Sequence, residues 1–116
     1  MQIPRPTNEA KQRFRDLVPT DPRVVIKPMF GNLGAFVQGN MFMGLFGSDV
    51  GVNLSATDQA EVRAAGGSSF GPAERPMGGY VTLPASASVA QLHAWIAASL
   101  NYVALQPPKR PKAAKR

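Results

Sequence analysis

The chain has 116 residues, of which 44% are apolar, so it is large enough for one globular domain and unlike a disordered protein. It contains no cysteine, which excludes a disulfide framework and any thiolate metal site. The net charge is +6, but five of the 13 basic side chains lie in the segment 109–116. The remainder is nearly neutral, so whole-chain charge does not predict nucleic-acid binding.

The first predicted element is a helix that begins at Thr7 or Asn8 and ends near Val18. Threonine and asparagine are favourable N-cap residues, and the apolar side chains that follow recur at helical spacing on one face. Pro19 and Pro22 end this helix, because proline cannot continue the backbone hydrogen-bond pattern.

Short strands are predicted next. Arg23–Lys27 is rich in β-branched residues, and we expect Pro28 to bend or bound this strand. Met29–Val37 and Met41–Phe46 then predict the two arms of a hairpin that turns at Gln38–Asn40.

The second half of the chain predicts one more meander strand, two helices and a last strand. Val50–Leu54 alternates apolar with small or polar residues, as a strand does. Ser55–Ala65 and Ser88–Val103 each begin with a capping-box pattern that is typical of a helix start. Between them, Gly66–Met77 predicts a loop and Gly79–Leu83 a strand.

The expected order is helix, antiparallel β-meander, helix, strand, helix, which is an α+β fold with one sheet and its covering helices. We expect one domain over residues 1–106 and a basic, disordered tail over residues 107–116. No apolar run approaches the roughly 18 residues of a membrane span, and no signal sequence is evident, so we expect a cytoplasmic protein without membrane contact.

No pattern predicts a catalytic residue, a cofactor or a metal ligand, and no small-molecule substrate is evident. The single histidine, His93, lies in a predicted helix without partners for a triad or a metal site. The acidic residues fall in turns, caps and on helix faces, and Gly66–Gly71 lacks the Lys and Ser/Thr that complete a phosphate-binding loop. We therefore expect a protein that is not an enzyme.

Methionine and aromatic residues are unusually dense between residues 29 and 46. They could stack nucleobases, but Lys27 is the only basic residue near them, so a core or an interface with a protein partner or a second copy is favoured. The predicted contact residues come from the hairpin and from the loop before the last strand: Lys27, Met29, Phe30, Met41, Met43, Arg75, Met77 and Tyr80.

The C-terminal tail supports an alternative function, weak and sequence-independent nucleic-acid binding through phosphate contacts. The other interpretation is a solvated extension that aids solubility. The candidate phosphate-binding residues are Lys109, Arg110, Lys112, Lys115 and Arg116.

The segments Lys27–Gly31 (KPMFG), Gly39–Phe42 (GNMF) and Arg75–Val81 (RPMGGYV) resemble, in order and spacing, the N-terminal domain of the TfoX/Sxy family. The resemblance implies an α+β fold similar to the secretion-chaperone-like class, and it supplies no catalytic residues. Longer members carry a second, helical domain and are associated with regulating natural competence. This chain has a basic tail there, so the resemblance implies a regulatory or adaptor protein that acts through protein contacts, without the competence role itself.

Overall fold

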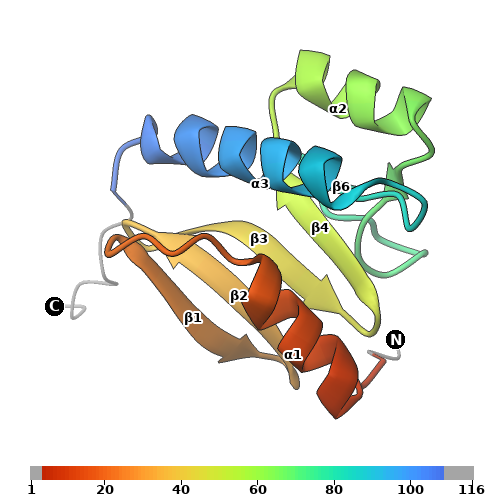
Figure 1. Cartoon of the computed structure of the whole chain (residues 1–116), viewed down its shortest axis with the longest axis horizontal. Helices are drawn as coiled ribbons and strands as arrows, with labels where there is room; N and C mark the ends of the chain where they lie inside the picture. Colours follow the sequence, from red (N-terminus) through yellow and green to blue (C-terminus); the bar gives the residue numbers. More distant parts are fainter. Residues whose placement is uncertain (1–3, 109–116) are drawn as a thin grey trace, which may run out of the picture.

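The computed structural model of the chain describes residues 4–108 and has the α+β architecture that the sequence predicts (Figure 1). Three helices and six strands follow one another along this part of the chain. Their order is α1 (Asn8–Leu17), β1 (Val24–Met29), β2 (Asn32–Val37), β3 (Asn40–Phe46), β4 (Asp49–Asn53), α2 (Ala56–Ala64), β5 (Ser68–Ser69), β6 (Tyr80–Thr82) and α3 (Val89–Ala104).

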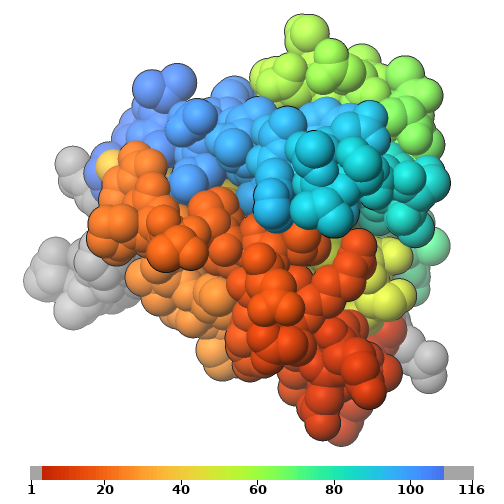
Figure 2. All heavy atoms as spheres, in the orientation of Figure 1, coloured from red at the N-terminus to blue at the C-terminus, as the bar shows by residue number. Residues whose placement is uncertain are grey.

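The strands form one antiparallel sheet in the order β1-β2-β3-β4-β6-β5. Helix α3 packs across β2, β3 and β4, and α1 packs against both α3 and β2. In Figure 2, α1 and α3 lie side by side on this face of the molecule. The helices therefore cover one face of the central sheet, and we call the opposite face the open face.

The hydrophobic core lies between the sheet and the helices. Alternate residues of β2 and β4 point into it, as the two-residue period of a strand requires. In β3 the register with β2 shifts at a β-bulge, because Ala35 pairs with Met43 while Phe36 pairs with Met41. The extra residue, Phe42, is fully buried together with its neighbour Met43. The bulge thus places two consecutive large side chains in the core.

Helix α3 is held to the sheet by a buried hydroxyl as well as by apolar packing. Ser99 is fully buried, and its Oγ lies 2.7 Å from the carbonyl oxygens of both Phe42 and Asn53. These two carbonyls belong to β3 and β4, so the single Ser99 hydroxyl proton is within reach of backbone acceptors on two neighbouring strands.

The predicted helix starts are confirmed by their capping hydrogen bonds. The side chains of Thr7 and Ser55 accept hydrogen bonds from backbone N–H groups in the first turns of α1 and α2. At α3, Ser88 and Gln91 form both hydrogen bonds of a capping box. The three helices therefore begin where local sequence chemistry places them.

Two strand boundaries differ from the prediction by more than one residue. Pro28 does not end the first strand, which continues to Met29, and the expected arm Met29–Val37 is split by a turn at Phe30-Gly31. β1 is an edge strand of the described sheet, and an edge tolerates a residue without a backbone N–H. The short strand β5 also lies inside the segment predicted to be a loop.

Candidate protein-contact surface on the open face

Three glycines lie side by side across the open face of the sheet. Gly34 of β2 pairs with Gly44 of β3, and Gly44 pairs with Gly51 of β4. Because glycine has no Cβ, the backbone of these three strands is accessible to groups that approach from this side.

The protein's own side chains cover the two outer glycines. The ring of Phe70 lies so close to Gly51 that a Cβ atom there would overlap it. On the other side, the sulfur atoms of Met41 and Met29 lie 3.0 and 3.2 Å from where a Cβ of Gly34 would be. The central glycine, Gly44, is left as the floor between these two groups.

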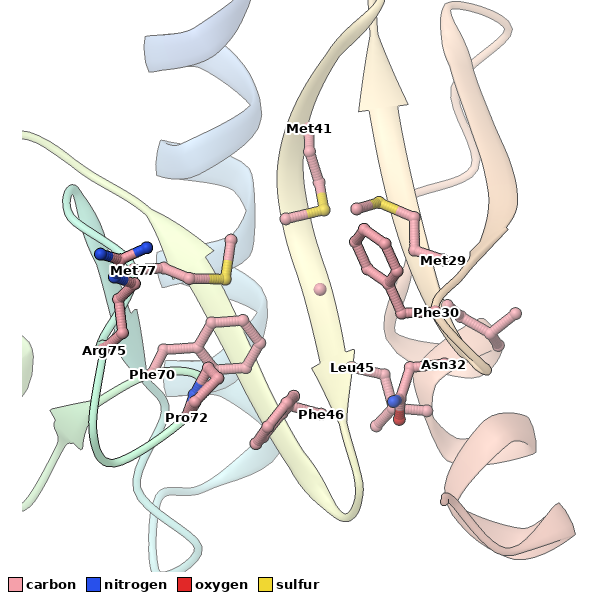
Figure 3. Close-up of a pocket in the computed structure, with 12 residues that line it drawn as sticks. Met29, Phe30, Asn32, Met41, Leu45, Phe46, Phe70, Pro72, Arg75 and Met77 are labelled. Carbon is pink, nitrogen blue, oxygen red and sulfur yellow. The ribbon is translucent and has the colours of Figure 1, made fainter. Parts of the chain in front are cut away.

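The space above Gly44 is a half-open groove with a volume of about 410 Å³, which we call the open-face groove. Figure 3 shows its two walls: Met29, Phe30 and Met41 on one side, and Phe70 and Met77 on the other. The volume and the apolar lining fall in the range of natural binding pockets. The remaining described residues that line it are Asn32, Leu33, Leu45, Phe46, Pro72 and Arg75.

Phe30 has an unusual conformation for an exposed aromatic residue. Its side chain is 78% exposed, and its φ of 51° lies in the left-handed region that bulky residues rarely adopt. The next residue, Gly31, also has a positive φ of 80°, so the pair forms a tight turn of the kind that asparagine and glycine favour. A phenylalanine in this turn costs free energy that no burial within the described structure offsets.

Few polar groups face the groove. Asn32 is buried, and both ends of its amide are engaged: it donates to the Pro4 carbonyl at 3.0 Å and accepts from the Gly47 N–H at 2.8 Å. Arg75 is exposed at the rim and makes no ion pair with any of residues 4–108. The lining that the structure describes thus combines an apolar surface with one unpaired cation.

The structure brings five of the eight predicted contact residues together around the groove: Met29, Phe30, Met41, Arg75 and Met77. Lys27 lies beside this group, with its ammonium 4.7 Å from the centre of the Phe36 ring. The Tyr80 hydroxyl donates a hydrogen bond of 2.8 Å to the Met41 carbonyl, and burial raises the pKa of this hydroxyl. These two residues therefore border the groove without lining it.

Met43 does not belong to this surface. It is 0% exposed and lies in the core on the helix-covered face, so a partner cannot reach it in this structure. In a regular strand, Met43 would share one face with Met41. The β-bulge at Phe42 breaks that alternation and turns Met43 toward the helices.

Phe70 is the functional candidate that the sequence does not mark. It lies in a segment rich in glycine and serine, where a single aromatic residue has no periodicity. In the structure its ring is buried between Phe46 and Tyr80, with ring centres 6.2 and 6.1 Å away. The unusual glycine at position 51 of an apolar strand was the available signal, since it indicates close approach of another group.

The predicted phosphate-binding residues of the tail lie outside residues 4–108, and nucleic-acid binding through them stays a prediction. These residues are Lys109, Arg110, Lys112, Lys115 and Arg116. Within the described residues, none of the helices combines the length and apolar character that crossing a membrane requires.

Fold and surface together define a small α+β domain with a helix-covered antiparallel sheet and an apolar groove on its open face. Residues 16–102 match the family described as TfoX N-terminal domain, and the chain belongs to this family. The family is regulatory and non-catalytic, which suggests a regulatory or adaptor role. Comparison with curated proteins and with solved structures finds no match.

Proposed function

We propose that this chain is a non-enzymatic regulatory or adaptor protein that acts through protein–protein contacts made by the open-face groove. The partner is another protein or a second copy of the chain. The observation that carries the proposal is the apolar groove itself, which gathers methionine and phenylalanine side chains from separate segments on the face that the helices leave uncovered.

The composition of the groove suits a protein partner. Methionine side chains are flexible and polarisable, so Met29, Met41 and Met77 can adapt to the shape of an inserted side chain. Exposed apolar patches on small proteins commonly mark interaction sites. Among the described lining residues there is no histidine, acid, serine or cysteine that could act as a general base or a nucleophile, which favours contact over chemistry.

The test is affinity capture with a charge placed in the groove. The variant Met77→Lys puts an ammonium group against the apolar wall, whereas Leu105→Lys makes the same kind of change at a residue that is 86% exposed after α3. We expect the wild type and Leu105→Lys to retain the same protein partner, or the same dimer by light scattering, and Met77→Lys to lose it. Retention by all three proteins would refute the groove as the contact surface. A strict monomer at micromolar concentration without any captured protein would refute the function.

A further inference from the structure

The groove already shows how it accommodates an aromatic ring. Phe70 lies directly on the backbone of Gly51, and its ring edge is 3.3 Å from where a Cβ of Gly44 would be. The adjoining floor at Gly44 is also bare backbone, and Met41 Cε lies 3.3 Å from the same Cβ position, so the free volume of the groove begins above the Met41 and Phe70 side chains. A second flat or bulky apolar group would therefore lie beside Phe70 and extend the aromatic packing of the open face.

Among the described residues, the charged side chains that line the groove and the neighbouring hollow have one sign. Arg75 is on one rim, and a second hollow on the other side of Phe30 is lined by Arg5 and Lys11. No aspartate or glutamate is among the described residues that line either hollow. Phe30 thus separates an apolar groove from a cationic hollow, and a ligand that spans both must combine an apolar group with negative charge.

An aromatic side chain fits the groove better than a nucleobase, although a nucleotide also combines a ring with negative charge. A base presents hydrogen-bonding edges that need partners once they leave water. Asn32 is the only uncharged polar side chain of the described lining, and its amide is already engaged by Pro4 and Gly47. A hydrocarbon ring makes no such demand.

We propose that the open-face groove binds a polypeptide segment in which a large apolar side chain is flanked by carboxylates, an inference that rests on the proposed function. Phenylalanine is the side chain that fits best. The ring packs against the Met41 and Phe70 side chains in the open-face groove. The flanking carboxylates face Arg75 on one rim and the Arg5–Lys11 hollow on the other.

The experiment uses the full chain with labelled backbone amides and methionine methyl groups, titrated by NMR with acetylated, amidated hexapeptides. The probe is Glu-Glu-Phe-Phe-Glu-Glu, and the controls are Glu-Glu-Ala-Ala-Glu-Glu and Lys-Lys-Phe-Phe-Lys-Lys. We expect the probe to shift the Gly44 amide and the methyl groups of Met41 and Met77. Each control should bind about tenfold more weakly or not at all, because it lacks either the ring or the charge.

Two matched variants isolate the charge of the groove from the charge of the whole chain. Arg75→Glu should weaken binding of the probe by about fivefold, whereas Arg63→Glu, at an exposed site on α2 away from the groove, should leave it unchanged. An equal effect of the two variants would show that only net charge matters and would overturn the proposal.

Other results would also overturn it: equal binding of the alanine or lysine peptide, shifts confined to α1 or α3, or tighter binding of hexathymidylate at the same methionines. These failures are distinct from failure of the proposed function. If Met77→Lys abolishes a protein contact while all hexapeptides fail, the groove is a contact surface for a partner of different chemistry. If Met77→Lys has no effect, the contact surface itself is wrong.

Discussion

The two faces of the central sheet are built from different residues and serve different purposes. On the helix-covered face, large side chains such as Phe42 and Val52 are fully buried against α1 and α3. On the open face, the same strands carry Gly34, Gly44 and Gly51, and the apolar groups come from flexible methionines and from a loop. Packing on the first face supplies stability, and the second has an apolar groove that residues 4–108 do not fill. The following substitutions test this division.

The largest effect is expected in the core. Phe42→Ala removes a fully buried ring and should lower the free energy of unfolding by about 3–5 kcal/mol. Met77→Ala, on the groove wall, should cost less than about 1 kcal/mol because that side chain is only partly buried. Urea denaturation followed by the fluorescence of the buried Trp95 measures both. Equal losses would contradict the division between the faces.

The next effect distinguishes two glycines of the open face. Gly51→Ala would overlap the Phe70 ring and force it to move, at a cost of about 1–3 kcal/mol. Gly44→Ala should cost less, because its new methyl meets Met41 Cε and the edge of the Phe70 ring at 3.3 Å without overlapping them. Thermal unfolding of the two variants checks this. A larger loss at Gly44 than at Gly51 would show that the groove floor is not accessible space.

Replacing Phe30 should separate stability from binding. Phe30→Asn creates an Asn-Gly turn suited to positive φ and should raise stability by about 0.5–1 kcal/mol, while weakening the Glu-Glu-Phe-Phe-Glu-Glu complex. Gln38→Asn is the matched control, because Gln38-Gly39 forms a turn with similar φ angles of 55° and 81° away from the groove lining. It should stabilise the fold equally and leave binding unchanged. If Phe30→Asn binds the peptide as well as the wild type does, Phe30 is not part of the binding site.

The smallest effect concerns Tyr80 at the border of the groove. Burial raises the pKa of its hydroxyl above the ordinary value of 10.0, although a hydrogen bond from the Asn53 side chain acts in the opposite direction. Because the unfolded tyrosine ionises first, its contribution to stability is present at neutral pH and is lost as the pH rises through the folded pKa. Urea midpoints measured on both sides of about pH 10 should fall more for the wild type than for Tyr80→Phe. If the urea midpoints of the wild type and Tyr80→Phe fall equally with pH, the raised pKa of Tyr80 would be contradicted.

The sequence predicts the helices well because their starts are local. Ser88 and Gln91 form their capping box within one turn, so no distant contact is needed to place α3. Prediction from the sequence fails where contacts between distant residues decide the structure. The β-bulge that buries Met43 depends on pairing between β2 and β3, and the turn at Phe30 has a conformation that local preference disfavours.

The candidate site was half predictable for the same reason. Met29, Phe30 and Met41 are close in sequence, and their density indicates a surface or core cluster. Phe70 reaches the same place from a loop, and only its fit over Gly51 in the folded sheet shows that it forms the opposite wall. Arg75 and Met77 of that second segment are predicted contact residues, but no local pattern shows that the segment packs over the glycines of the sheet.

The most direct test of the central claim is isotope-filtered NMR on the complex with Glu-Glu-Phe-Phe-Glu-Glu. Contacts between the peptide's phenylalanine ring and the methyl groups of Met29, Met41 and Met77 would place the ring in the open-face groove. Met43 provides an internal control, because it is fully buried on the other face and should show no contact. Ring contacts to α1 or α3, or to none of the three groove methionines, would contradict the account.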